Sequence, residues 1–348
     1  YYFDKGVDWD SLVQITEHDF AEADGEGFET TEEALDFYRD IVEMFGEFVA
    51  EEIKPYEKEI DEKGVEFVDG EVVFPERLAS IFEKIKELDL HGLTVPRELG
   101  GMNAPMMVYF MNSELMARAD VSAMAHHGFH GGIAMAALVF SALEGSSDID
   151  PVTGRINETR WRDVIEEIAS GEAWGCMDIT EPDAGSDMAA LRSVGEQDAD
   201  GTWYGTGEKI FSTSGPGTHQ IVIARTEDAD PDDPTGGLNG LSMFLVRTYE
   251  DDADGNRNRT VQLTRVEEKL GHHGSATCGL VFDKAPAELL VKRGEGFKYM
   301  LTLMNNARLG VGFECLGLSE SAYRTAVDYA AERGYMGKTI DRHEMIAE

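Results

Sequence analysis

The segment ITEPDAGSDMAALRS, residues 179–193, sets the interpretation of the whole chain. Pro182 fixes its own φ angle and keeps the residue before it out of the helical region, whereas Gly185 lets another group approach the backbone closely. The segment also offers backbone N–H groups and the hydroxyls of Thr180 and Ser186. These groups suit a flat polar ring or a phosphate better than a metal ion, so we interpret the first part of the segment as a shaped binding loop.

On either side of this loop the apolar pattern differs. Apolar residues at spacings of three and four predict helices before it. These helical patterns lie at residues 31–60, 75–89, 105–119, 129–144 and 158–170. After Gly171, short segments rich in β-branched and aromatic residues alternate with Gly, Asp and Pro, which is typical of an antiparallel sheet or barrel. From Gly296 a long helical pattern returns.

We therefore predict an α+β fold in three parts. Residues 1–172 form an N-terminal, mostly helical domain, and residues 173–288 form a central β-barrel or sheet domain. Residues 289–348 form the beginning of a C-terminal helical bundle. The final residues, DRHEMIAE, stop within a helical pattern without a cap or a Gly/Pro stop signal, so we expect this bundle to be incomplete.

The charge of the chain excludes one class of partner. Of 348 residues, 68 are acidic and 30 are basic, which gives a formal net charge of -38. Phosphates would be repelled across most of such a surface, so we expect no nucleic-acid partner. A hydrophobic content of 42% argues against disorder despite the charge. Because concentrated salt screens self-repulsion, we interpret the chain as halophilic, adapted to a salt-rich cytosol.

Cysteine usage and hydropathy indicate a cytoplasmic protein. Cys176, Cys278 and Cys315 are widely spaced and odd in number, so they form no disulfide framework and favour a reducing compartment. The longest apolar run, GGIAMAALVFSAL from Gly131, is shorter than the ~20 residues that a membrane-spanning helix needs. We therefore expect no integral membrane segment, and no signal peptide is visible.

Several motifs, in the right order, resemble those of the acyl-CoA dehydrogenase flavoprotein family. TEPDAGSD at 180–187 is similar to the family's TEPxAGSD loop, and GEKIFSTSG at 207–215 is similar to its GxKxWITNG strand. The segment 267–291 resembles the part that closes the β domain. NNARLGVG at 305–312 and YAAERGYMGKTI at 329–340 resemble the first two bundle helices. The variant HGSATC suggests the larger-chain branch, which includes enzymes for methylthiopropionyl-CoA and for long acyl chains.

The resemblance implies FAD-dependent α,β-dehydrogenation of an acyl-CoA thioester to the trans-2-enoyl-CoA, as in fatty-acid β-oxidation. It implies electron-transferring flavoprotein as the electron acceptor, and a homodimer or homotetramer, or an assembly in which a separate chain carries the C-terminal bundle. Because a thioester α-proton is weakly acidic, the site must stabilise enolate-like charge and exclude water. Two alternatives stay open: a non-catalytic subunit that binds flavin or CoA within a larger assembly, and an acyl-CoA oxidase.

The resemblance also assigns residues to the cofactor and the substrate. The expected FAD-binding residues are Ile179, Thr180, Gly185, Ser186, Phe211, Ser212, Thr213, Arg333, Tyr335 and Met336. Phe211 stands where the family usually has Trp, and the last three residues are expected to reach the FAD of a neighbouring subunit. The expected substrate-binding residues are Ser186, Asn305 and Arg308, of which Arg308 would help to hold the CoA part.

The catalytic base is not found in the chain. At one family position the residue is Ala307, which cannot accept a proton, and in other members the base follows on a later helix, here beyond residue 348. Glu314 is the nearby carboxylate, and we interpret it as an ordinary helix residue. We predict no metal site.

Two segments of the chain are rich in histidine, AHHGFHGG at residues 125–132 and GHHG at residues 271–274. We interpret His126, His127 and His130 as helix-end or pocket-lining residues, because the glycines among them interrupt helical i,i+4 spacing. His272 and His273 are expected to cap or line the CoA channel.

Overall fold

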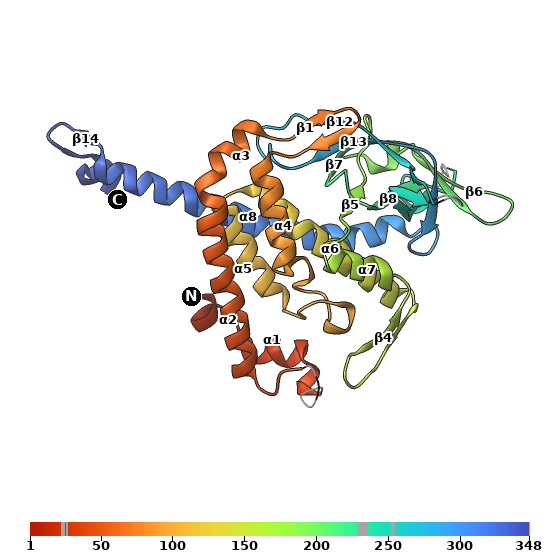
Figure 1. Ribbon diagram of the computed structural model, residues 1–348, viewed down its shortest axis with the longest axis horizontal. Helices are drawn as coiled ribbons and strands as arrows, with labels where there is room; N and C mark the ends of the chain where they lie inside the picture. The colour runs from red at the N-terminus through yellow and green to blue at the C-terminus, as the bar shows by residue number, and fades with distance from the viewer. Residues whose placement is uncertain (22–24, 26, 229–234, 252–254, 348) are drawn as a thin grey trace.

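The computed structural model describes residues 1–348 except 22–24, 26, 229–234, 252–254 and 348. Helices come first, then strands, then a long helix, which confirms the α+β fold class (Figure 1). The helices are α1 (Trp9–Thr16), α2 (Thr31–Phe48), α3 (Glu57–Lys63), α4 (Glu76–Glu87), α5 (Met106–Ala117), α6 (Val121–Leu143), α7 (Arg162–Ala169), α8 (Gly296–Glu332) and α9 (Glu344–Ala347).

The strands of the central domain run from β5 to β13, and short hairpins lie outside them. The strands are β1 (Glu66–Val68), β2 (Glu71–Val73), β3 (Ser147–Ile149), β4 (Ile156–Thr159), β5 (Gly175–Asp178), β6 (Val194–Gln197), β7 (Trp203–Thr213), β8 (His219–Arg225), β9 (Leu241–Arg247), β10 (Tyr249–Asp251), β11 (Arg257–Arg259), β12 (Val261–Val266), β13 (Thr277–Leu289), β14 (Gly334–Tyr335) and β15 (Lys338–Thr339).

Helix α2 forms where the sequence combines an N-cap residue with apolar residues at helical spacing. The Thr30 hydroxyl accepts the N–H of Glu33 at 3.2 Å and so caps the helix, whose apolar face is buried. The helix predicted for residues 31–60 ends as a regular α-helix at Phe48, and irregular helical turns follow. Pro55 lies in these turns and cannot donate a backbone hydrogen bond, so the chain bends before α3 begins.

Helix α6 begins earlier than the sequence pattern predicts. It starts at Val121 rather than at residue 129, because the Asp120 carboxylate caps it by accepting the N–H of Ala123 at 2.7 Å. The helix continues without interruption through Gly128, where a methyl group would meet the Tyr109 hydroxyl of α5 at 2.2 Å. The glycine therefore allows α5 and α6 to approach closely instead of ending the helix.

The central strands close into a ring. Along the sheet the strand order is β12-β13-β7-β6-β8-β5, and β9 pairs with both β8 and β13. Because β9 joins the two sides, β13, β7, β6, β8 and β9 form a closed circuit around a core that includes Cys176, Cys278, Phe244 and Phe282.

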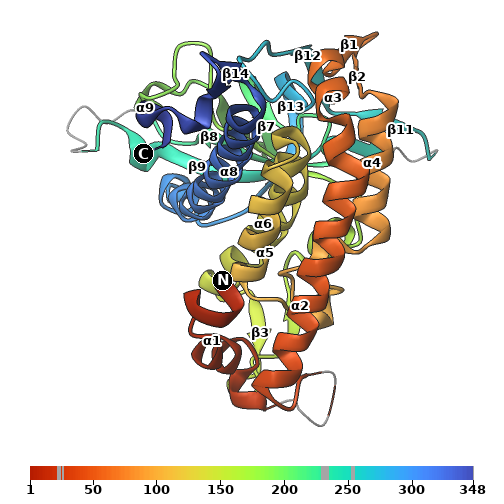
Figure 2. The same cartoon turned by 90° about the vertical axis from the view of Figure 1, so that its left-hand side faces the viewer.

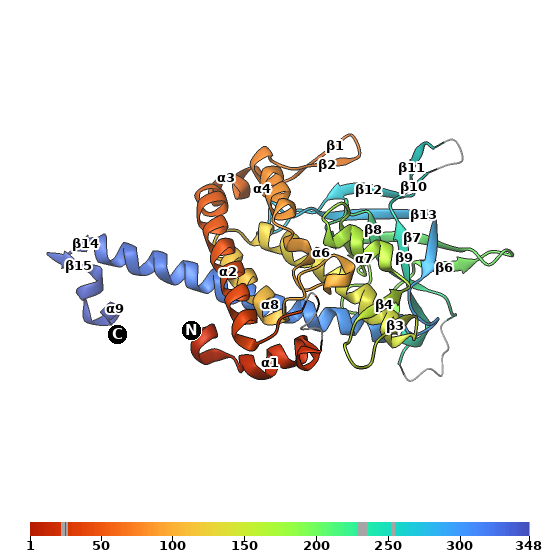
Figure 3. The same cartoon turned by 60° about the horizontal axis from the view of Figure 1, so that its bottom comes forward.

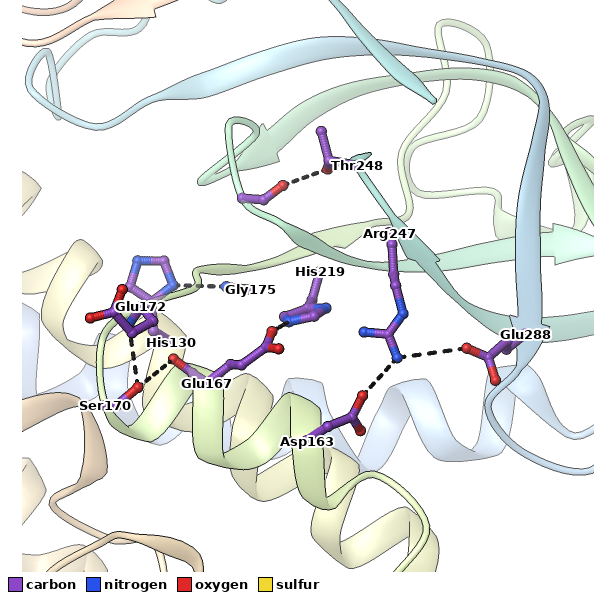
Figure 4. A network of polar contacts seen from close by, with 11 residues as sticks. His130, Asp163, Glu167, Ser170, Glu172, Gly175, His219, Arg247, Thr248 and Glu288 are labelled. Atoms are coloured by element: carbon purple, nitrogen blue, oxygen red, sulfur yellow. Dashed lines mark hydrogen bonds and ion pairs between the residues drawn. The ribbon is translucent and has the colours of Figure 1, made fainter. Parts of the chain in front are cut away.

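Polar contacts fasten the helical domain to this barrel, as Figure 4 shows. On α7, the Glu167 carboxylate lies 2.8 Å from Nε2 of His219 on β8, and the Asp163 carboxylate lies 2.9 Å from the guanidinium of Arg247 on β9. The two contacts hold α7 against β8 and β9 of the barrel. The helical domain and the β domain are therefore docked on each other.

Helix α8 joins the two domains and then leaves them. Its first half packs along α5 and α6 and against β9 (Figure 2), and its second half extends away from the body toward the β14–β15 hairpin and α9 (Figures 1 and 3). The projecting half exposes apolar side chains, among them Leu316, Leu318, Tyr323, Val327 and Tyr329. Among the described residues, none of the helices has the length and apolar content that crossing a membrane requires.

Candidate active site

A cavity of about 450 Å³ lies where the helical domain, the barrel and α8 meet. Its walls come from α5 and α6, from β5 and β7, from the loop between β12 and β13, and from α8. Much of the wall is apolar, including Met124, Phe129, Ile133, Met177 and Leu303. A mostly apolar cavity with a few polar groups at a domain junction is the usual form of a site for a small molecule or a cofactor.

The strand motif GEKIFSTSG contributes two residues to this wall. Phe211 and Thr213 of β7 face the cavity, and Phe211 remains 52% exposed although it is aromatic. Its φ of 54° lies in the left-handed region, which is costly for a non-glycine residue and is found at functional sites. Ser212 between them points the other way and is buried, so the structure does not bring its side chain to the cavity.

A buried ion pair holds the 179–187 loop. The Lys209 ammonium on β7 lies 2.8 Å from the Glu181 carboxylate and donates to the carbonyl of Ile179 at 3.0 Å. The backbone N–H of Ile210 donates to the carbonyl of Thr180 at 2.9 Å. Lys209 is fully buried, and this burial lowers the pKa of its ammonium group against the opposing effect of Glu181. These contacts anchor the first residues of the loop to β7.

The outer part of the loop is open. Gly185 and Ser186 are exposed, and a methyl group added at Gly185 would meet only the Thr180 side chain, at 3.9 Å. The loop follows directly after β5, and Met177 of β5 lines the cavity. Thr180, Gly185 and Ser186 of the loop do not line the cavity. Because Gly185 and Ser186 are exposed, a ligand larger than the cavity could extend over this part of the loop.

Behind the loop lies a carboxyl group that sequence reasoning missed. Asp178, the last residue of β5, is completely buried and accepts the thiol hydrogen of Cys176, with the sulfur 3.3 Å from its oxygen. Burial raises the pKa of the Asp178 carboxyl to about 6. It faces the barrel core and does not line the cavity.

One face of α8 lines the cavity with residues three and four apart. These residues are Leu303, Met304, Ala307, Gly310, Val311 and Glu314, with Asn306 beside them. Asn305 and Arg308 lie on the exposed side of the helix, where the Arg308 guanidinium donates to the Asn305 side chain at 2.7 Å. The structure thus brings Ala307 to the cavity, and it does not bring Asn305 or Arg308 there.

Glu314 has a different environment from that of an ordinary helix residue. Its side chain is 13% exposed, lines the cavity and lies 2.8 Å from Nε2 of His272. His272 also lines the cavity, and its φ of 56° is in the left-handed region. The spacing of Glu314 at seven residues from Ala307 could have indicated a shared face, because i and i+7 lie on one side of a helix. His273 points outward to Asp61, 2.7 Å away.

The histidines of α6 lie in one continuous helix and are buried together with His91. His130 Nδ1 accepts the backbone N–H of Gly175 at 3.2 Å, so its proton lies on Nε2, which is 3.2 Å from His126 Nδ1. The expected interruption by glycines is therefore wrong, since His126 and His130 are paired at i,i+4. Burial lowers the pKa of His91 to about 4 and that of His127 to about 3, so all these rings are neutral.

The three residues expected to serve a neighbouring cofactor lie far from the cavity. Arg333, Tyr335 and Met336 are at the end of α8 and in the β14–β15 hairpin, on the part that projects from the body (Figure 1). All three are exposed. They do not contribute to the cavity of their own chain.

Three domain models of one protein family match successive parts of the chain. The model of the acyl-CoA dehydrogenase N-terminal domain matches residues 36–144, that of the middle domain matches 176–285 and that of the C-terminal domain matches 294–348. The acyl-CoA dehydrogenase of Bacillus subtilis is 31% identical over 310 residues, covering 87% of this chain and 71% of that protein.

Two further relatives extend the comparison. The 3-methylmercaptopropionyl-CoA dehydrogenase of Ruegeria pomeroyi is 30% identical over 306 residues, covering 86% of this chain, which spans 49% of that protein's length. The solved structure of an acyl-CoA dehydrogenase from Bacillus anthracis complexed with FAD aligns with a TM-score of 0.69 at 22% identity, covering 89% of this chain and 48% of that one. This last likeness concerns the fold.

The helical domain, the small barrel and the bundle helix that surround the cavity correspond to the three domain models that match the chain. The chain belongs to the acyl-CoA dehydrogenase family. That family consists of oxidoreductases that act on acyl-CoA and use FAD.

Proposed function

We propose that this protein dehydrogenates an acyl-CoA thioester between Cα and Cβ, with FAD as the oxidant. The observation that carries the proposal is the 450 Å³ cavity, in which the flavin-motif residues Phe211 and Thr213 and the family's base position, Ala307, line the same space. Three segments far apart in the sequence supply these residues. Their convergence on one cavity supports a site for two reactants rather than a structural void.

The residues at the cavity fit a flavin. A half-exposed aromatic ring at Phe211, held in a strained backbone conformation, is suited to stacking against a flat ring system. Thr213 offers a hydroxyl beside it. The carbonyls of Ile179 and Thr180 are already hydrogen-bonded to Lys209 and Ile210, so these two residues would meet the ring through their N–H groups and the Thr180 hydroxyl. Gly185 and Ser186 would hold the pyrophosphate. When bound, FAD supplies the acceptor for the hydride that leaves Cβ of the substrate.

The chain's own residues bind and orient the thioester in this proposal. Met177, Leu303 and Val311 give the reacting carbons an apolar surrounding, which strengthens the electrostatic stabilisation of negative charge on the thioester oxygen. Ala307 stands at one family position of the general base and cannot accept a proton, so no residue of the described chain is assigned that role. Asn305 and Arg308, on the exposed side of α8, would meet the CoA portion.

The proposed partners follow from the family. Electron-transferring flavoprotein would accept the electrons. In a dimer, Arg333, Tyr335 and Met336 of one copy of the chain would contact the FAD bound to the second copy. Their exposure on the projecting end of α8 supports this assignment. The protein would work in fatty-acid oxidation in the cytoplasm, and the free thiols of Cys176, Cys278 and Cys315 support a reducing compartment.

The experiment uses the full-length protein reconstituted with FAD. We expect a yellow protein whose flavin absorption bleaches when an acyl-CoA is added without oxygen and returns when electron-transferring flavoprotein is supplied. A protein that stays colourless with FAD would contradict the proposal. Rapid reoxidation by air with release of peroxide would instead identify an oxidase.

A non-catalytic subunit is the second candidate. It is favoured by Ala307 and by the pairing of Glu314 with His272, because among the described residues no free carboxylate lines the cavity. Such a subunit would bind FAD and acyl-CoA, and its flavin would not bleach.

A further inference from the structure

A buried carboxyl group lies directly behind one wall of the cavity. Asp178 is completely buried and stands between Met177, which lines the cavity, and Ile179, the first residue of the shaped loop. Because successive side chains of a strand point to opposite faces, the Asp178 side chain lies on the barrel side of β5, whereas Met177 faces the cavity. The wall between the carboxyl group and the cavity is therefore one strand thick.

Strand β7 is arranged in the same way. Phe211 and Thr213 line the cavity, and Ser212 between them is buried on the barrel side. The Ser212 hydroxyl lies close enough to the Asp178 carboxyl to lower its pKa, so these two side chains meet in the barrel core. Asp178 and Ser212 thus lie at the back of the wall whose front carries Phe211 and Thr213.

The charges behind this wall do not balance. The fully buried Lys209 ammonium lies 2.8 Å from the Glu181 carboxylate and is also attracted by Asp178. Two carboxyl groups thus share one ammonium group, which leaves one negative charge when both are ionised. Among the described residues, Oδ2 of Asp178 has no hydrogen-bond partner. This oxygen is therefore free to take up a proton.

The Asp178 carboxyl can change its charge near neutral pH. Burial raises its pKa to about 6, against the opposing effects of Ser212, Cys176 and Lys209. Two thiols act on the carboxyl as well, Cys176 on its own strand and Cys278 on β13. Burial raises the pKa of both thiols, that of Cys278 to about 12, so they stay neutral while Asp178 titrates.

A charge in this place matters because the charge of a flavin depends on its redox state. Uptake of a hydride adds two electrons and one proton, so the cofactor gains one negative charge. A negative charge nearby opposes this gain, and it does so strongly where little water screens it. Neutralising that charge makes reduction easier.

We propose that Asp178 sets the reduction potential of the bound flavin from behind the cavity wall. The ionised carboxylate lowers the potential, and a proton taken up at Oδ2 removes this effect. Asp178 touches neither the cofactor nor the substrate and acts through the wall that β5 and β7 form. This inference rests on the proposed function, because it assumes that the flavin lies against Phe211 and Thr213.

The test measures the midpoint potential of FAD in the full-length protein, by chemical reduction with reference dyes between pH 5 and pH 8. In Asp178→Asn the amide keeps the shape of the side chain and can still accept the Cys176 thiol hydrogen, but it carries no charge. At pH 8 and equal potential, we expect the ratio of reduced to oxidised flavin to be about tenfold higher in the variant, a midpoint about 30 mV higher. At pH 5 the midpoints should agree, because Asp178 is then protonated in the parent.

A second variant keeps the carboxyl group and changes its surroundings. Cys176→Ala removes a thiol that favours the ionised form, so the pH at which the parent's potential responds to Asp178 should move upward. The matched control is Glu208→Gln on β7, where the carboxylate is exposed and lies 3.4 Å from Arg265. Water screens this charge, so the control should have the parent's midpoint at every pH.

Two results would overturn the inference: equal midpoints at pH 8 for the parent and a folded Asp178→Asn, or a difference that persists at pH 5. If Asp178→Asn does not fold, a potential whose pH response is the same in Cys176→Ala as in the parent would overturn it. The proposed function fails separately, since chemical reduction requires no substrate. Potentials that depend on Asp178 in a protein whose flavin no acyl-CoA bleaches would refute the dehydrogenation and support the role of Asp178.

Discussion

At the scale of the residue, Lys209 is the side chain whose loss we expect to be most costly. Replacing it in Lys209→Met leaves the buried Glu181 carboxylate without a counter-charge and frees the carbonyl of Ile179. Breaking a buried pair in this way costs about 3–5 kcal/mol. Chemical unfolding should show this loss, and the variant should also retain FAD poorly because the loop loses its anchor.

The control for this prediction is Lys58→Met. The Lys58 ammonium is 82% exposed and lies 3.6 Å from Glu62, so its removal should leave the unfolding midpoint nearly unchanged. Equal midpoints for the two variants would show that the Lys209–Glu181 pair does not stabilise the loop.

The buried histidines predict a dependence of stability on pH. The pKa values of His91, about 4, and of His127, about 3, lie below the 6.5 of an exposed imidazole. Between those values the unfolded chain binds protons that the folded chain does not, so the free energy of unfolding falls as pH drops below about 6.5. Each histidine contributes up to about 1.4 kcal/mol per pH unit in that range. Above pH 7 the effect is absent.

The variant His127→Met isolates this effect from the titration of the many carboxylates. Neither ring nitrogen of His127 has a hydrogen-bond partner among the described residues, so the variant should be about as stable as the parent at pH 7.5. Denaturant unfolding at pH 7.5, 6 and 5 should show a smaller decline for the variant. Parallel declines would contradict the assignment.

Residue identities predicted part of the site. Phe211, Thr213 and Ala307 were expected near a ligand from local motifs, and the cavity includes all three. The spacing of Glu314 from Ala307 indicates a shared face of α8, but its contact with His272 and the place of Lys269 in the cavity wall depend on which loop packs against α8. Ser212 faces the barrel core because successive side chains in a strand alternate.

At the scale of the element, α8 depends on glycines where it crosses α5. A methyl group at Gly317 would lie 2.5 Å from the carbonyl of Glu114 and 2.8 Å from the Ala117 side chain. Gly317→Leu should therefore force α8 away from α5 and destabilise the protein by about 1–3 kcal/mol or more. Thermal unfolding measures this, and acyl-CoA affinity should fall because α8 forms a wall of the cavity.

Gly312 on the same helix is the matched control. It is exposed, and nothing lies within 4 Å of a methyl group added there. Gly312→Ala should stabilise the helix by about 0.5–1 kcal/mol, because alanine has the higher helix propensity. A loss of stability in Gly312→Ala as large as in Gly317→Leu would mean that crowding is not the cause.

Most helices and strands were predicted, because their patterns are local. Helix α5 lies within one residue or two of its predicted range, and the extended segments after Gly171 form the barrel strands. The start of α6 was not predicted, since glycines lower helix propensity and only the approach of Tyr109 explains Gly128. The pairing of β9 with both β8 and β13 was likewise not predicted, because strand pairing depends on tertiary structure and not on the local sequence pattern of each strand.

At the scale of the whole molecule, charge sets the conditions for stability. With a net charge of -38, repulsion among surface carboxylates opposes folding, and salt screens it. We expect the thermal unfolding midpoint to rise steadily from low salt to molar KCl. A midpoint that is highest at low salt would contradict a salt-adapted surface, and sucrose serves as the control for a general solute effect.

The cavity has walls from α6, from β7 and from α8, which belong to separate stretches of the chain. Whatever fills it touches all three at once and can do so only while they are docked. Limited digestion with trypsin should therefore slow when the cavity is filled, even at peptide bonds remote from the ligand. The bound ligand would stabilise the docked arrangement of these elements, so protease resistance would detect binding before any chemical step occurs.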